Sequence, residues 1–105
     1  MLRGDVHEIH LTSRAGRVQR GRRYAVIVQA DDLLALSTVV VCPTSASTPP
    51  ASFHPEVEVG GDPTRVMCEM VGAVDARALG PQVGHLRLEE LRSVDDALLL
   101  VLDLR

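Results

Sequence analysis

The sequence predicts a mainly β domain, in which five to six short strands form a small curled sheet or barrel and one carboxyl-terminal helix packs on it. Two observations predict this class. Short β-branched runs are separated by turn residues, and the apolar pattern changes to helical spacing from Leu88 onward. The chain has 105 residues, of which 46% are hydrophobic, so we expect a single domain over residues 1–105 with its own core.

The clearest predicted strand is Thr38–Cys42, a valine-rich run that we expect to end at Pro43 because proline cannot donate a ladder hydrogen bond. The other runs are also short and rich in β-branched or alternating apolar residues, and they are bounded by turn residues or charge. They are Gly4–Leu11, Tyr24–Val28, Glu56–Val59, Arg65–Val71 and, as a sixth, Gln82–Leu86.

The segments between these runs have the composition of loops and turns. Residues 44–55 are small, polar and rich in proline, which predicts a loop, and residues 60–63 (Gly-Gly-Asp-Pro) predict a turn. In Arg65–Val71 a strand would place alternate side chains on one face of the sheet. Those side chains are Val66, Cys68 and Met70.

The carboxyl-terminal segment predicts an amphipathic helix. Leucine or valine recurs every three to four residues between Leu88 and Leu102, and the acidic residues lie off this stripe. They fall mainly in the first half of the segment, where a carboxylate is favourable to the helix dipole. Arg87 stands at the N-cap position, where Ser, Thr or Asp is preferred, so we expect a poor cap.

Cysteine and histidine spacing argues against a metal or redox site. Cys42 and Cys68 lack CxxC spacing, and we expect them to be buried, reduced thiols in strands. His7 and His10 would point to opposite faces of a strand. The longest apolar run, residues 97–102, is too short to span a bilayer, and the first 20 residues lack the apolar segment of a secretory signal. We therefore expect a cytoplasmic protein without metal or cofactor.

Charge is divided unevenly along the chain. Residues 1–24 hold six arginines against two carboxylates, a net charge of +4, whereas residues 25–105 hold five arginines against twelve carboxylates, a net charge of −7. Five arginines fall within residues 14–23, where two glycines favour a loop. Such a loop indicates an anionic partner, either nucleic acid or an acidic peptide. Because Tyr24 and Phe53 are the only aromatic residues, we expect no stacking platform for bases.

The order of short motifs along the chain resembles that of the MazF/PemK family of toxin endoribonucleases. The similarity covers nearly the whole chain, and no single motif is specific alone. The motifs are, in order, Arg3-Gly4-Asp5-Val6, then Arg22-Arg23-Tyr24 leading into Val28, then Val39 through Thr44-Ser45, then Val66-Met67-Cys68, and finally Gly84-His85-Leu86 through Leu102-Asp103-Leu104.

This resemblance implies an SH3-like barrel of the PemK/MazF/CcdB type, forming a homodimer. It implies the toxin of a type II toxin–antitoxin system, which cuts single-stranded RNA without metal or cofactor and is neutralised by a cognate antitoxin protein. The family's catalytic Arg and Thr map onto Arg23 and Thr44, and Ser45 is a further candidate for binding RNA. The remaining arginines of the loop would hold neighbouring phosphates. They are Arg14, Arg17, Arg20 and Arg22.

The residue types fit this chemistry, but the general base stays open. A guanidinium can hold two phosphate oxygens and a threonine hydroxyl can donate to the same group. The acidic residue that the family often has in this loop is replaced by Val18, and His7 and His10 are the nearest candidate bases in the sequence. The alternative is a non-catalytic barrel of the same fold, a binding or inhibitor module similar to the gyrase inhibitor CcdB.

Overall fold

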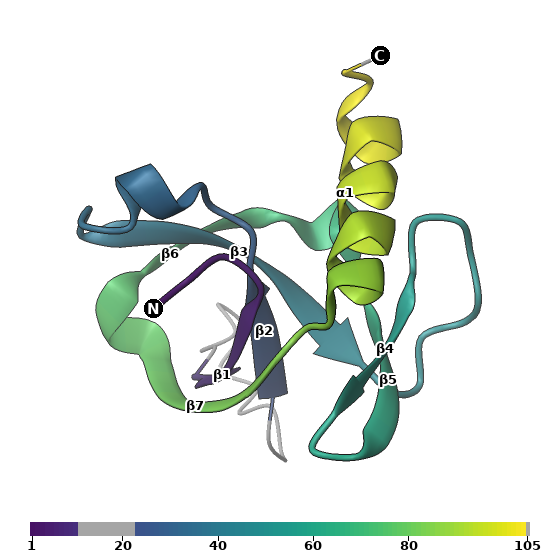
Figure 1. The fold of residues 1–105 in the computed structure, drawn as a ribbon, viewed down its shortest axis with the longest axis horizontal. Coiled ribbons are helices and arrows are strands. Elements are labelled where there is room, and N and C mark those ends of the chain that lie inside the picture. The colour runs from purple at the N-terminus through teal and green to yellow at the C-terminus, as the bar shows by residue number, and fades with distance from the viewer. Residues whose placement is uncertain (11–22, 105) are drawn as a thin grey trace, which may run out of the picture.

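The protein is described by a computed structural model, in which residues 1–10 and 23–104 are placed. These residues form seven strands, three short 3-10 turns and one helix, and Figure 1 shows the helix standing over one side of a strongly curled sheet. No helix within these two ranges is long and apolar enough to cross a membrane. The elements are β1 (Asp5–Ile9), β2 (Arg23–Ile27), η1 (Asp31–Leu33), β3 (Thr38–Ser45), β4 (Glu56–Val59), β5 (Asp62–Val66), η2 (Cys68–Met70), β6 (Gly72–Asp75), η3 (Ala76–Ala78), β7 (Leu79–His85) and α1 (Leu88–Leu102).

Strand β3 organises the sheet because it pairs with three other strands. The sheet order is β4-β5-β3-β2-β1-β7, and β6 joins β3 beside this path. Along one edge β3 pairs with β2, and along the other it pairs first with β6, through Thr38–Val41, and then with β5, through Thr44 and Ser45. All of these pairs are antiparallel. This change of partner lets the β4–β5 hairpin turn away from the rest of the sheet.

The core is almost entirely aliphatic and lies on both faces of β2. One cluster lies between the sheet and α1, where Val94 and Ala97 pack against the buried side chains of the strands. A second, smaller cluster fills the other side of the curled sheet around Ile27 and Val41. The predicted class, a mainly β fold with one carboxyl-terminal helix, is therefore confirmed, with seven strands where five to six were expected.

The predicted end of the third strand at Pro43 is wrong. β3 continues to Ser45, since Pro43 lies opposite Ala25 in the register and its carbonyl accepts a hydrogen bond from the Met67 amide at 2.8 Å. Two further pairs to β5 follow, at Thr44 and Ser45. The missing amide of the proline therefore interrupts the ladder without ending the strand.

The predicted strand Arg65–Val71 is also wrong in its second half. β5 ends at Val66 and the chain turns through η2, so Cys68 is fully buried while Met70 is 60% exposed rather than on the same face. β6 and the first residues of β7 were not predicted, because their glycines, alanines and prolines give little apolar alternation.

Both cysteines are buried and free, as expected, although Cys68 lies in η2 instead of a strand. The neighbouring Cys68 thiol and burial raise the pKa of Cys42, which keeps that side chain an uncharged thiol. The pair therefore acts as part of the core between β3 and η2.

The Arg3-Gly4-Asp5 motif ties the start of the chain to α1. Gly4 has a φ of +95°, and a Cβ atom there would come within 3.3 Å of the side chains of His85 and Leu91, so only glycine fits without strain. The Arg3 guanidinium donates to Asp95 on the helix at 2.6 Å and to the Val28 carbonyl at 2.8 Å.

Asp5 is buried and receives several donors. The Leu2 amide donates to it at 2.8 Å and the His85 Nδ1 at 2.6 Å. Burial would raise the pKa of Asp5, but the hydrogen bonds from His85 and from the Leu2 amide outweigh it and lower the pKa. The Arg3-Gly4-Asp5 motif thus has a structural role.

Glu90 compensates for the poor N-cap of the helix. Its buried carboxylate accepts hydrogen bonds from the Arg87 amide and from the Glu58 amide, each at 2.8 Å. The first bond is half of a capping box, and the second joins α1 to β4. Burial alone would raise the pKa of Glu90, but these backbone donors lower it. One carboxylate therefore both starts the helix and fixes it to the β4–β5 hairpin.

His54 anchors the loop between β3 and β4. The buried ring faces the Pro49 carbonyl with Nδ1 at 2.8 Å and the Glu69 carboxylate with Nε2 at 2.5 Å. Both partners are acceptors, so the doubly protonated ring satisfies them together. The Glu69 carboxylate and then the Pro49 carbonyl raise the pKa of His54. His54 thus holds the loop against η2, most strongly when its ring is protonated.

We expect Glu90→Gln to destabilise the fold by about 1–3 kcal/mol, since one backbone donor then faces the amide NH₂ instead of an acceptor. The lowered folded-state pKa means that the carboxylate stabilises the fold above its ordinary pKa of 4.5, and that this contribution is lost as the pH falls through the folded value. Urea unfolding of both proteins at pH 7 and at lower pH measures the difference, which should shrink in acid. Glu89→Gln, on the exposed side of the same turn, is the control. An equal loss in that variant would contradict this assignment.

We expect Glu69→Gln to lower the pKa of His54 toward its ordinary value of 6.5. Because the folded-state pKa of His54 is raised, the pair stabilises the fold most at pH values below 6.5, and the contribution disappears as the pH rises through the folded value. NMR titration of the imidazole resonances measures the pKa directly, with Glu58→Gln on the exposed face of β4 as control. An unchanged His54 pKa in Glu69→Gln would show that the pair has no such effect.

Candidate functional site

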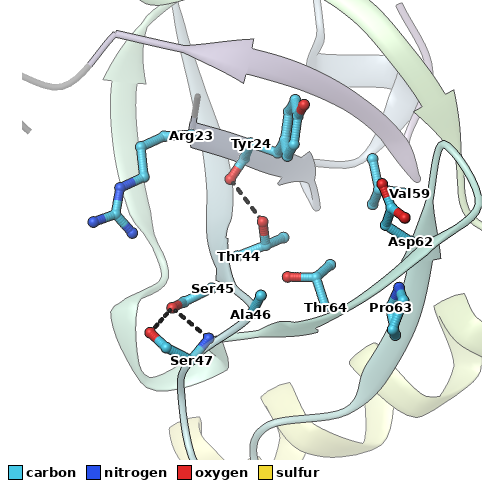
Figure 2. Close-up of a pocket in the computed structure, with 10 residues that line it drawn as sticks. All are labelled: Arg23, Tyr24, Thr44, Ser45, Ala46, Ser47, Val59, Asp62, Pro63 and Thr64. Carbon is cyan, nitrogen blue, oxygen red and sulfur yellow. Dashed lines mark hydrogen bonds between the residues drawn. The ribbon is translucent and has the colours of Figure 1, made fainter. Parts of the chain in front are cut away.

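A pocket of about 320 Å³ opens where β2, β3 and the β4–β5 hairpin meet. Its volume lies at the lower end of the range of small-molecule sites, roughly 300–1,000 Å³. Figure 2 shows the residues that line it, which are Arg23, Tyr24, Thr44, Ser45, Ala46, Ser47, Val59, Asp62, Pro63 and Thr64.

The register between β2 and β3 brings two distant segments of the chain to this pocket. Ala25 pairs with Pro43, and continuing the register toward the strand ends sets Tyr24 opposite Thr44 and Arg23 opposite Ser45. Side chains alternate along a strand, so Arg23 and Thr44 leave this two-stranded ladder on different sides. Arg23 and Thr44 nevertheless both line the pocket, because the pocket lies at the end of this ladder.

Thr44 is the more buried of these two side chains, at 4% exposure. Its hydroxyl lies 3.4 Å from the Tyr24 carbonyl, which is a long and therefore weak hydrogen bond. The hydroxyl can rotate to donate to a ligand in the pocket at small cost. Next to it, the Ser45 and Ser47 hydroxyls lie 3.2 Å apart and add two more polar groups to the rim.

Arg23 is partly buried at the first position of β2. No carboxylate in the described ranges pairs with its guanidinium. Figure 2 shows this group at one end of the pocket, beyond Thr44 and Ser45. An arginine without an anionic protein partner beside three hydroxyl groups is well suited to hold an anion such as a phosphate.

The β4–β5 hairpin forms the opposite wall. Gly60 and Gly61 connect the strands with φ values of +61° and +87°, the two positive angles that a type I′ turn needs. The turn places Asp62 and Thr64 on the pocket side. The turn could be predicted from the sequence but the position of its side chains could not, because the hairpin reaches the pocket only through the pairing of β5 with the end of β3.

The structure brings together three of the residues predicted as a site, Arg23, Thr44 and Ser45. The arginines of the preceding loop lie outside the described residues, as does Val18. Tyr24, by contrast, was not predicted as a site residue and lines the pocket. The loop arginines that lie outside the described residues are Arg14, Arg17, Arg20 and Arg22.

Neither histidine considered as a general base lines the pocket. His7 is buried on β1, where its Nδ1 lies 2.9 Å from the Gly80 carbonyl and its Nε2 has no hydrogen-bond partner among the described residues. His10 lies just beyond β1, and its amide bonds to the Ala78 carbonyl. The His7 ring thus faces β7, whereas His10 follows Ile9, which lies opposite Arg23 in the pairing of β1 with β2. In the described part of the chain no three side chains of metal-binding type converge.

Comparisons with known proteins agree on one family. The family model described as "PemK-like, MazF-like toxin of type II toxin-antitoxin system" matches residues 2–102. The toxin candidate Rv3098A of Mycobacterium tuberculosis is 34% identical over 99 residues, which cover 92% of each chain.

Solved structures share the fold at low sequence identity. An endoribonuclease in complex with its cognate antitoxin, from Mycobacterial species, has a TM-score of 0.83 at 16% identity and covers 100% of this chain and 97% of its own. A MazE–MazF complex from Deinococcus radiodurans has a TM-score of 0.83 at 19% identity with the same coverage of both chains. The Mycobacterium tuberculosis toxin MazF-mt6 has a TM-score of 0.78 at 18% identity, over 94% of this chain and 96% of its own.

The family model spans nearly the whole chain, and the sequence relative and the fold agree with it. This chain belongs to the PemK/MazF family of toxins of type II toxin–antitoxin systems.

Proposed function

We propose that this toxin is an endoribonuclease that cuts single-stranded RNA in the cytoplasm without a metal ion. The observation that supports this most is that one pocket holds the Arg23 guanidinium, which pairs with no carboxylate of the described residues, and the weakly bonded Thr44 hydroxyl. Relatives of the same fold include endoribonucleases.

The RNA, the pocket and solvent water together supply the groups that the reaction needs, except for a base. The 2′-oxygen attacks the adjacent phosphorus and forms a new P–O bond, its proton passing to a base. The P–O5′ bond breaks and the 5′-oxygen takes up a proton from the protonated base or from solvent water, which leaves a 2′,3′-cyclic phosphate and a 5′-hydroxyl. Arg23 would hold two phosphate oxygens and stabilise the charge of the phosphorane, and Thr44 would donate to the same phosphate and fix its position. Ser45 would contact the phosphate from the rim.

A cognate antitoxin and a second copy of the chain are the proposed protein partners. Relatives with the same fold have been solved with their antitoxins. Among the described residues β4, β6 and β7 each pair with one strand only, and exposed edges of small sheets commonly pair with another chain. An acidic or amphipathic segment of the antitoxin would compete with RNA for the arginine-rich loop.

The second candidate function is a non-catalytic inhibitor similar to the gyrase inhibitor CcdB. One observation favours it: the last turn of α1 and the residues after it expose three leucines, Leu100, Leu102 and Leu104, at 49% or more. These side chains could contact a protein target. In that case variants at the helix end would abolish toxicity, variants of Arg23 would not, and DNA supercoiling would be inhibited while RNA stayed intact.

We expect Arg23→Ala and Thr44→Val each to reduce the cleavage rate of RNA by about 10²–10³-fold in the presence of EDTA, the usual loss when one stabilising donor is removed. Valine keeps the volume of the buried Thr44 and removes only its hydroxyl. The measurement is the single-turnover cleavage rate of a long mixed-sequence RNA. Arg92→Ala, which removes one exposed arginine on α1, is the control. Equal rates in all four proteins would refute the assigned site.

We expect Arg17→Ala and Arg20→Ala each to weaken RNA binding by a similar factor for every RNA sequence. The reason is that phosphate contacts set the affinity for RNA and do not distinguish one sequence from another. Each lost contact should also reduce the slope of log affinity against log salt concentration by about 0.7 on single-stranded RNA. Fluorescence anisotropy at several salt concentrations measures this slope. A loss confined to particular sequences would instead indicate that these arginines contact bases.

A further inference from the structure

Asp62 is an unexpected residue in a pocket suited to phosphate. It follows the Gly60-Gly61 turn, lines the same pocket as Arg23 and Thr44, and is exposed. No side chain in the described ranges donates a hydrogen bond to its carboxylate or forms an ion pair with it. A carboxylate repels phosphate. In an RNA-binding pocket it therefore contributes favourably to binding only where the ligand presents hydrogen-bond donors to it.

The position of Asp62 separates it from the phosphate end of the pocket. Figure 2 shows Asp62 at one end and the Arg23 guanidinium at the other, with Thr44 and Thr64 between them. With the scissile phosphate on Arg23 and Thr44, the carboxylate would face the part of the nucleotide that extends away from the phosphate, which is the base.

The donor pattern of the four bases selects one of them. In a single strand the Watson–Crick edge is available to a protein. On this edge guanine alone presents two adjacent donors, N1–H and the 2-amino group, which match the two oxygens of a carboxylate. Cytosine and adenine present one amino group beside a ring-nitrogen acceptor, and uracil presents one N–H between two carbonyl oxygens, which a carboxylate would repel.

Other residues of the pocket suit a base between Arg23 and Asp62. Tyr24 lines the same pocket and is the one aromatic side chain in it, so its ring can contact the face of a base. Stacking of this kind contributes to the binding of any base and does not distinguish among them. Val59 and Pro63 add an apolar surface to the hairpin wall.

We propose that Asp62 recognises a guanine adjacent to the cleaved phosphate, accepting hydrogen bonds from N1–H and the 2-amino group with its two carboxylate oxygens. The proposal rests on the proposed function, since it takes the phosphate position from Arg23 and Thr44. Asp62 is then a specificity-determining residue and takes no proton in the reaction.

The test uses 2′-deoxynucleoside 3′,5′-bisphosphates of guanine, adenine, cytosine and uracil, which carry the phosphate and the base but lack the attacking hydroxyl. Calorimetric titration of the full chain should show the guanine compound binding about tenfold more tightly than the others, the usual discrimination of a bidentate pair. Asp62→Asn should reduce this preference to about twofold or less while phosphate affinity stays equal or rises. Asp32→Asn, which removes an exposed carboxylate on η1 outside the pocket, should leave it unchanged.

Cleavage of a mixed-sequence RNA, mapped by sequencing, separates the two proposals. Cleavage beside guanine that becomes indifferent to the base in Asp62→Asn supports both. Cleavage without guanine preference overturns the role of Asp62 and leaves the nuclease standing. Guanine-selective binding without any cleavage overturns the nuclease and leaves the role of Asp62 standing. An equal slowing of cleavage at every sequence in Asp62→Asn, with loss of an acidic limb of the pH–rate profile, would make Asp62 the general base and overturn the proposal.

Discussion

The antiparallel register of β2 and β3 is the constraint on which the site depends. Because Ala25 pairs with Pro43, the first residues of β2 and the last residues of β3 end side by side, and the chain brings Arg23 next to Thr44 and Ser45 across about twenty residues of sequence. A shift of one residue in this pairing would reverse the facing of every side chain on one strand. Ala25, Val26 and Ile27 are fully buried and pack alternately into the two core clusters, so a shift would move each side chain into the packing of the other cluster.

A second constraint is the change of partner along β3. After pairing with β6, β3 passes to β5 at Thr44, and this folds the β4–β5 hairpin over the end of the β2–β3 ladder. Buried polar groups fix the hairpin and the loop before it: Glu90 joins β4 to the helix, and His54 holds the loop against η2. Such groups are costly unless all their hydrogen bonds are made, which restricts the hairpin and loop to one arrangement. The pocket is therefore lined by elements that are each tied down elsewhere.

The fold class and one wall of the pocket could be predicted from the sequence. Valine-rich runs and the leucine spacing of α1 are local signals, and they predicted most of the sheet and the helix. The predictions failed where a distant partner decides the local structure. Pro43 does not end β3, because Met67 supplies a donor to its carbonyl, and Cys68 leaves the strand pattern because η2 turns the chain toward β6. The hairpin that carries Asp62 can be predicted from Gly60-Gly61, but the strand end that it covers cannot.

The central claim is that one phosphate of RNA is held between Arg23 and Thr44. The most direct measurement is a crystal structure of the protein with an oligonucleotide that has 2′-deoxyribose at the cleavage position, so that the strand stays intact. The account predicts one phosphate within hydrogen-bond distance of both the Arg23 guanidinium and the Thr44 Oγ1. A phosphate bound to only one of the two, or an RNA strand that passes outside this pocket, would contradict it.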